Sequence, residues 1–148
     1  MALSKQGIIL PSTTCCQCNL VEETSDHALI RCSFARKVMT WILKWCNITI
    51  VNFHTVNEVL DYASNWGNCP KKKKRLLGIC YGTLWGIWKA RNERLFNNQL
   101  MCALKVVNII QSITFLWFRH RGDGGGLNWT KWNVLPFNSL QWFFLYLF

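Results

Sequence analysis

Three cysteines and one histidine near the start of the chain follow the pattern Cys-x2-Cys-x8-His-x4-Cys, formed by Cys15, Cys18, His27 and Cys32. Three thiolates and one imidazole can occupy the corners of a tetrahedron around a single Zn²⁺, which prefers these donors. The two residues between Cys15 and Cys18 are the spacing of a chelating pair in such sites. The pattern therefore predicts that these four side chains bind one structural zinc ion.

The alternative interpretations are a disulfide pair with one free thiol, and coincidence in a chain that has 8 cysteines. A histidine at metal-ligand spacing between cysteines is not a property of disulfide frameworks, which favours the metal site. Cys16 is left out of the ligand set, because a pair formed by Cys16 and Cys18 would have a single residue between its ligands. Four protein ligands leave no open position for an activated water, so the zinc is not expected to be catalytic.

Two stretches of the chain resemble the zinc-binding domain that lies downstream of the polymerase in plant non-LTR (LINE-type) retrotransposon reverse transcriptases. The first stretch runs from Leu10 to Trp41 and contains the four ligands, the triplet Glu22-Glu23-Thr24 and the pair Ala35-Arg36. The second is Leu84-Trp85-Gly86-Ile87-Trp88-Lys89-Ala90-Arg91-Asn92-Glu93-Arg94, followed by Phe96. Together they cover most of residues 7–135.

The resemblance implies an accessory module that helps a reverse transcriptase (RNA-directed DNA polymerase) hold its template. Family members usually carry a segment with Trp and Lys ahead of the position of Gly7-Ile8, and this chain begins just before that point. We therefore expect the module to be incomplete at its N-terminus.

Positive charge dominates the composition, with 17 Lys and Arg against 7 Asp and Glu and a formal net charge of +10. Such an excess is typical of proteins that bind polyanions, most often nucleic acid. We predict phosphate contacts from two clusters, which are Lys71, Lys72, Lys73, Lys74 and Arg75 after Pro70, and Lys89, Arg91 and Arg94 further along. A nuclear-import signal and a solvated helix start are the alternatives for the first cluster. Trp85 and Trp88 are expected to fill the core rather than to stack on bases.

An inventory of acidic residues argues against polymerase or RNase H chemistry in this chain. Both reactions need a cluster of carboxylates that holds two metal ions. The chain has no Asp-Asp pair, and its only adjacent acids, Glu22 and Glu23, belong to the predicted metal loop. No Cys/His nucleophile pair lies in a recognisable signature either. We predict no enzymatic activity and no small-molecule substrate for the chain alone.

Apolar periodicity predicts a mainly α fold, with a small zinc-binding module at 1–46 and a helical region at 55–121. The helical body after the zinc-binding module is expected to contain about three to four helices. A helix over 33–46 would bury Phe34, Val38, Trp41, Ile42 and Trp45. Thr55 and Glu58 form a capping box that starts a second helix, and Pro70 suits the first position of a long helix to residue 97. The last predicted helix covers 104–119.

Within the long helix, one predicted inward stripe consists of Leu77, Cys80, Leu84, Trp88, Arg91 and Leu95. On another face, Gly78, Gly82 and Gly86 recur every four residues, which would let a neighbouring backbone come close. Near the metal ligands, Ser25 is expected to cap a short helix, and Asp26 could orient the imidazole of His27.

Residues 122–148 are expected to form a Gly-rich break and a flexible, loosely packed apolar tail. The longest uncharged apolar run before this tail, residues 76–88, has 13 residues and is too short for a bilayer-crossing helix. The chain shows no basic and apolar leader with a cleavage site, so we expect reduced thiols and a nuclear or cytoplasmic protein that is not secreted.

These observations predict a zinc-stabilised nucleic-acid-binding accessory module derived from a reverse transcriptase, without the polymerase active site. The first alternative is a zinc-stabilised helical module that contacts protein. The second is a degenerate retroelement fragment with no selected function.

Overall fold

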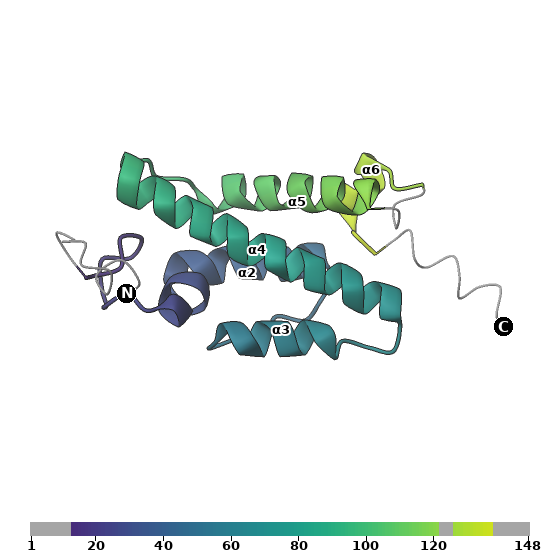
Figure 1. Ribbon diagram of the computed structural model, residues 1–148, viewed down its shortest axis with the longest axis horizontal. Helices are drawn as coiled ribbons and strands as arrows, with labels where there is room; N and C mark the ends of the chain where they lie inside the picture. The colour runs from purple at the N-terminus through teal and green to yellow at the C-terminus, as the bar shows by residue number, and fades with distance from the viewer. Residues whose placement is uncertain (1–12, 122–125, 138–148) are drawn as a thin grey trace.

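Every regular element in the described part of the chain, residues 13–121 and 126–137 of this computed structural model, is a helix (Figure 1). The elements are η1 (His27–Arg31), α2 (Ser33–Trp45), α3 (Val56–Ser64), α4 (Pro70–Asn97), α5 (Ala103–His120) and α6 (Trp129–Val134). An isolated antiparallel bridge joins Thr14 to Glu22 in the loop before η1. The predicted mainly helical fold, with a cysteine-rich N-terminal region, is confirmed.

Helix α4 contacts η1, α2, α3 and α5. It has 28 residues, which corresponds to a length of about 42 Å. In Figure 1, α5 lies above it, α3 below it and α2 behind it, and η1 also contacts it. None of the described helices, α4 included, combines the length and the apolar character that a membrane span requires.

The three glycines of α4 form the surface that receives α5, as their four-residue spacing predicted. A Cβ atom placed on Gly78, Gly82 or Gly86 would lie within 2.7 Å of an α5 side chain, so the two helices pack closer than larger residues would allow. The partners in chain order are Phe118, Thr114 and Ile110. Since these numbers fall as the glycine numbers rise, α5 runs antiparallel to α4.

The helix starts agree with the local signals in the sequence. The Thr55 hydroxyl accepts a hydrogen bond from the Glu58 N–H at 3.1 Å, and α3 begins at the next residue, Val56. The Glu58 carboxylate accepts from the N–H of His54 at 2.8 Å, one residue before the position that a reciprocal capping box uses. Pro70 is the first residue of α4, as predicted.

The predicted inward stripe of α4 is only partly correct. Cys80 and Leu84 are buried, but Trp88 is 49% exposed and Trp85 36% exposed, so the prediction that these tryptophans fill the core is wrong. The reason is that α4 is covered from several directions. Buried residues therefore occur on more than one face, and a single apolar stripe cannot describe them. Trp41 of α2 is likewise exposed.

The segment after α5 packs into the core, which corrects the expectation of a loose tail for residues 126–137. Asn128 caps α6, accepting from the Thr130 N–H at 2.8 Å. The indole of Trp132 is 1% exposed, and its Nε1–H donates to the Gln111 carbonyl at 3.0 Å. The Trp45 Nε1–H donates to the Trp132 carbonyl at 2.9 Å. The remaining parts of the predicted tail, 122–125 and 138–148, lie outside the described residues.

Replacing Gly82 with Ala tests the close contact between α4 and α5. The new methyl would meet Thr114 Cγ2 at 2.6 Å, and that side chain is held because its hydroxyl donates to the Ile110 carbonyl at 2.7 Å. Overpacking costs about 2 kcal/mol and the better helix propensity of Ala returns about 1 kcal/mol, so Gly82→Ala should lower the free energy of unfolding by about 1 kcal/mol. Chemical denaturation followed by circular dichroism measures it.

The control adds Thr114→Ser to Gly82→Ala. This second substitution removes the Thr114 Cγ2 methyl that the new methyl at position 82 would contact, and it keeps the hydroxyl. The double variant Gly82→Ala/Thr114→Ser should be more stable than Gly82→Ala alone. A gain in stability from Gly82→Ala by itself, as at an exposed helical glycine, would show that the two helices are not in close contact at this point.

Candidate metal centre

The four predicted ligands converge in space. The ligand atoms of Cys15, Cys18, His27 and Cys32 all lie within 4.8 Å of one another. Cys15 Sγ lies 3.9 Å from Cys32 Sγ, and Cys18 Sγ lies 3.3 Å from His27 Nε2. A tetrahedron with metal–sulfur bonds of about 2.3 Å has edges of about 3.8 Å between sulfurs. The separations therefore fit a single metal ion bound by three cysteines and one histidine.

A small backbone turn presents the first two ligands. The Glu23 N–H donates to the Thr13 carbonyl at 2.9 Å, and the Cys15 N–H donates to the Val21 carbonyl at 2.8 Å, which holds the two arms of the loop together. Between them Asn19 adopts a left-handed conformation with φ of 56°, which short polar side chains tolerate. The chain reverses direction just after Cys18, and the Cys18 thiol lies within 4.8 Å of the Cys15 thiol.

A π-helical turn brings the other two ligands together. Residues five apart on an ordinary α-helix point about 140° away from each other. In η1 the Cys32 N–H donates to the His27 carbonyl at 2.7 Å, a five-residue step that widens the turn and places the two side chains on one side. The sequence predicted the pairing of His27 with Cys32, but it predicted an ordinary helix. The N–H of His27 donates to Thr24 Oγ1 at 3.1 Å, so Thr24 rather than Ser25 caps this turn.

Two of the three ligand thiols lie in the interior of the protein. Cys15 and Cys32 are completely buried. Burial raises the pKa of Cys15 to about 12, although hydrogen bonds from the backbone of Cys18 and Gln17 act in the opposite direction. A thiolate at this position therefore needs a positive partner close to it. All eight cysteines are free thiols, so none of the alternative disulfides is formed.

The surroundings of His27 favour the neutral imidazole, which is the form that binds a metal. Partial burial and the neighbouring charge of Arg31 lower the pKa of His27. Asp26 does not orient this ring, contrary to the sequence-based expectation. Its Oδ1 instead accepts from the Val56 N–H at 2.9 Å and joins η1 to the start of α3.

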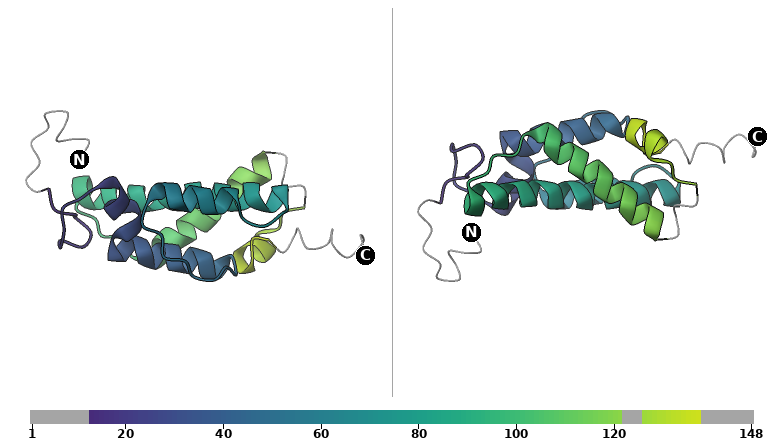
Figure 2. Two further views of the ribbon diagram at one scale, coloured as in Figure 1. Left: turned by 90° about the horizontal axis from the view of Figure 1, so that it is seen from below. Right: turned by 90° about the horizontal axis from the view of Figure 1, so that it is seen from above.

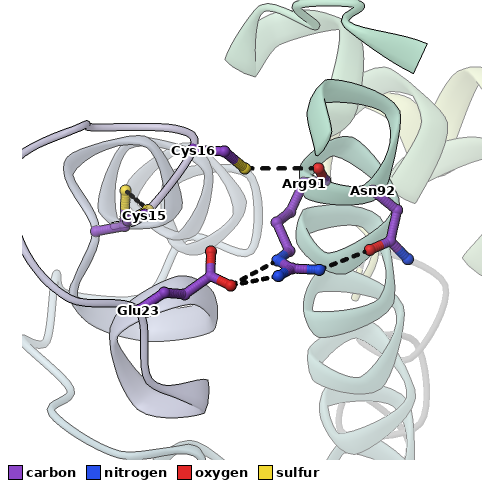
Figure 3. Close-up of polar contacts among 6 residues, drawn as sticks. Cys15, Cys16, Glu23, Arg91 and Asn92 are labelled. Atoms are coloured by element: carbon purple, nitrogen blue, oxygen red, sulfur yellow. Dashed lines mark hydrogen bonds and ion pairs between the residues drawn. The ribbon is translucent and has the colours of Figure 1, made fainter. Parts of the chain in front are cut away.

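An ion pair joins residues 13–32, which we call the metal loop, to α4 (Figure 3). The Arg91 Nε–H donates to Glu23 Oε1 at 3.0 Å, a second guanidinium nitrogen contacts the same oxygen, and Figure 3 shows the two side chains pointing toward each other. The exposed fractions are 6% for Glu23 and 14% for Arg91. Beside this pair, the Cys16 thiol donates to the Arg91 carbonyl at 3.7 Å. Cys16 therefore contacts α4. The Arg91 guanidinium forms an ion pair within the fold, and its contact with nucleic acid stays a prediction.

Arg75 is not a surface contact, and the prediction for it is wrong. Its side chain is 4% exposed, and its guanidinium donates to the Pro136 carbonyl at 2.7 Å. The guanidinium carbon lies 5.7 Å from the ring centre of Phe118 and 5.5 Å from that of Trp132. Arg75 therefore ties the segment after α6 to the start of α4. The sequence places it in a lysine run and has no local signal for these distant partners.

The other predicted cations of the second cluster stay near the surface. Lys89 Nζ lies 5.2 Å from the ring centre of Trp85. Arg94 donates to Asn98 Oδ1 at 3.2 Å at the end of α4. Fifteen residues separate Lys74 from Lys89, which is about 22 Å along the helix. The two predicted clusters therefore do not form one patch.

Two further positive side chains, from the end of α5, lie at the same end of the molecule as the first cluster. Lys71–Lys74 occupy the first turns of α4, and Phe118 packs on Gly78 one turn further along. The exposed residues Arg119 and Arg121 follow Phe118 at the end of α5, so they lie at the same end of the molecule (Figure 2). We call Lys71–Lys74, Arg119 and Arg121 the basic end.

Comparisons with family models, with curated proteins and with solved structures give no match for this chain. The resemblance to reverse transcriptase zinc-binding domains therefore stays a prediction from the two sequence blocks. The structure adds that these blocks touch, since Glu23 belongs to the first and Arg91 to the second.

The metal assignment predicts one bound ion per chain. Native mass spectrometry of protein purified under reducing conditions should find one metal ion, and Cys18→Ser together with Cys32→Ser should abolish binding, because two of four ligands are lost. Removing the ion with a chelator should increase hydrogen exchange in residues 13–32, since this loop has little apolar core of its own and a structural metal contributes folding free energy.

Cys16→Ser is the matched control, since it changes a neighbouring thiol that is not in the ligand set. This variant should keep a full equivalent of metal. The assignment is wrong if the parent protein carries no metal, or if the double variant at Cys18 and Cys32 retains it.

The ion pair makes a separate prediction. Arg91→Met should lower the free energy of unfolding of the metal-loaded protein by about 3 kcal/mol, because the Glu23 carboxylate would stay buried without its partner. Adding Glu23→Gln should recover a large part of this loss, because the remaining side chain is neutral. Chemical denaturation of the two variants in excess metal measures both effects. Additive losses in the double variant would show that the two side chains do not interact.

Proposed function

We propose that this protein is a zinc-stabilised helical module that binds nucleic acid with little sequence preference through its basic end. The observation that carries the proposal is that Lys71–Lys74 lie at the same end of the molecule as Arg119 and Arg121, in a chain of net charge +10. Lysines in the first turn of a helix interact unfavourably with the helix dipole. A polyanion bound there would offset both that interaction and the mutual repulsion of the lysines.

The proposed metal is zinc in a structural role. Three thiolates and one neutral imidazole are the donors that zinc prefers, and its usual coordination is tetrahedral. Four protein ligands fill that coordination, so the ion would stabilise the loop rather than activate a substrate. Reduced thiols at this site support a nuclear or cytoplasmic location.

The wider role we propose is that of an accessory to a polymerase. Its support is the resemblance to the zinc-binding domain of LINE-type reverse transcriptases, together with the scarcity of acidic residues in this chain. A module that holds template phosphates without base-specific contacts would help such a polymerase retain its substrate. The chain itself would have no polymerase or RNase H activity.

The alternative is a module that contacts another protein, and exposed aromatic side chains on α4 favour it. Tyr81 is 51% exposed and Trp88 is 49% exposed. The two functions differ in their dependence on salt. Binding to phosphates releases counterions and weakens steeply as salt rises, whereas an apolar protein interface depends on salt much less.

The proposed function predicts a steep salt dependence that the lysine run controls. With about four to six phosphates neutralised, log affinity should fall against log salt concentration with a slope of about −3 to −5. Replacing Lys71, Lys72, Lys73 and Lys74 with Gln should flatten this slope and leave the metal content unchanged. Fluorescence anisotropy of a labelled oligonucleotide across a salt series measures the slope.

The control carries the same change of charge at other places. Replacing the exposed residues Lys37, Lys44, Lys105 and Lys131 with Gln also lowers the net charge by four, from +10 to +6. This variant should keep most of the salt slope. If both quadruple variants behave alike, the protein attracts nucleic acid by net charge only; if neither differs from the parent, the protein-contact alternative moves ahead.

A further inference from the structure

Three aromatic side chains lie exposed along one face of α4. Tyr81 is 51% exposed, Trp85 36% and Trp88 49%. They are separated by four and then three residues, which is the spacing of neighbours on one face of a helix. We call Tyr81, Trp85 and Trp88 the aromatic stripe. It lies beside the glycine face that receives α5, so it borders the packed core without entering it.

The charges around the aromatic stripe are positive. Lys74 lies two turns before Tyr81 on the same face of α4, and it is exposed. Lys89 follows the stripe, with its ammonium 5.2 Å from the ring centre of Trp85. The only acidic residue in α4 is Glu93, whose carboxylate accepts a hydrogen bond from Asn97 at 2.9 Å beyond the stripe. A ligand with flat apolar groups and negative charge would therefore complement this face.

We infer that the aromatic stripe is a stacking platform for the bases of single-stranded nucleic acid. This inference rests on the proposed function and specifies its ligand. Bases present flat faces and the backbone supplies a negative charge at every residue, which matches rings interleaved with lysines. A folded protein partner would supply neither property at a regular interval.

The spacing of the stripe selects a single strand over a duplex. Along the helix axis Tyr81 and Trp85 are about 6 Å apart, and Trp85 and Trp88 about 4.5 Å. Successive bases in a duplex are about 3.4 Å apart and already stack on each other. Only a strand whose bases are splayed from one another can place a base on each ring.

Lysines on both sides of the aromatic stripe mark a path for the phosphates of the strand along α4. The Lys89 ammonium lies within reach of the phosphate of a nucleotide whose base stacks on Trp85. Lys74 is seven residues before Tyr81, about 10 Å along the axis, and it belongs to the basic end. A strand on the stripe would therefore continue onto Lys71–Lys74 without leaving α4.

The test compares a labelled single-stranded 15-mer with its duplex in anisotropy titrations of the full, zinc-loaded chain. Loss of one base–aromatic stack weakens binding by about 5- to 150-fold, so the double variant Trp85→Ala/Trp88→Ala, which removes two rings, should weaken single-strand binding by at least about 25-fold. Its affinity for the duplex should change by less than about twofold, since phosphate contacts dominate there. Trp85→Phe/Trp88→Phe keeps flat rings and should recover a large part of the loss.

Trp41→Ala is the matched control, because Trp41 is 45% exposed but lies on α2. It should leave both affinities unchanged. The inference is overturned if Trp85→Ala/Trp88→Ala weakens both forms equally or neither. It is also overturned if this variant changes only the molecular mass in sedimentation, which would assign the stripe to self-association. A parent protein that binds neither form rejects the proposed function as well, whereas binding of the duplex alone rejects only the single-strand platform.

Discussion

A charged side chain that is buried away from water needs a partner inside the protein. Two arginines of α4, Arg75 and Arg91, are largely buried, and their partners belong to the two irregular segments that pack against α4. Arg91 meets the Glu23 carboxylate, and so holds the metal loop against the C-terminal half of the helix. Arg75 donates to the Pro136 carbonyl, and so holds the segment after α6 at the other end. Because an uncompensated buried guanidinium or carboxylate is so unfavourable, these pairings determine where both segments dock.

Features that depend on neighbouring residues could be predicted from the sequence. The ligand spacing identified all four residues that converge at the candidate metal centre. Thr55 and Pro70 marked the starts of α3 and α4, because capping and proline geometry act within a single turn. The glycine spacing of α4 predicted the close approach of a neighbour, although not that the neighbour would be α5. In each case the physical cause lies within a few residues of the signal.

The incorrect predictions concern residues whose environment is determined by partners far away in the sequence. Arg75 and Arg91 look like surface cations in the sequence, and only partners 61 and 68 residues away show that they are buried. Trp85 and Trp88 follow a helical apolar period, but a helix covered by α2, α3 and α5 contains apolar residues in several directions, so the period does not reveal which face is left open. The packing of α6 escaped prediction for a related reason. Trp132 becomes a core residue through Trp45 and Gln111, which belong to two other helices.

The arrangement along α4 separates the candidate metal centre from the basic end. Arg91 follows Lys74 by seventeen residues, about 26 Å along the helix axis. A metal ion at the Cys15 and Cys32 thiols is therefore too far away to touch a strand at the basic end, and screening leaves little direct electrostatic influence over that distance. If the basic end binds nucleic acid as proposed, an effect of the ion on that binding would be transmitted through α4. The metal loop contacts this helix through Arg91, and the segment after α6 contacts it through Arg75. The aromatic stripe lies between these two attachment points, on a face of the helix that is exposed.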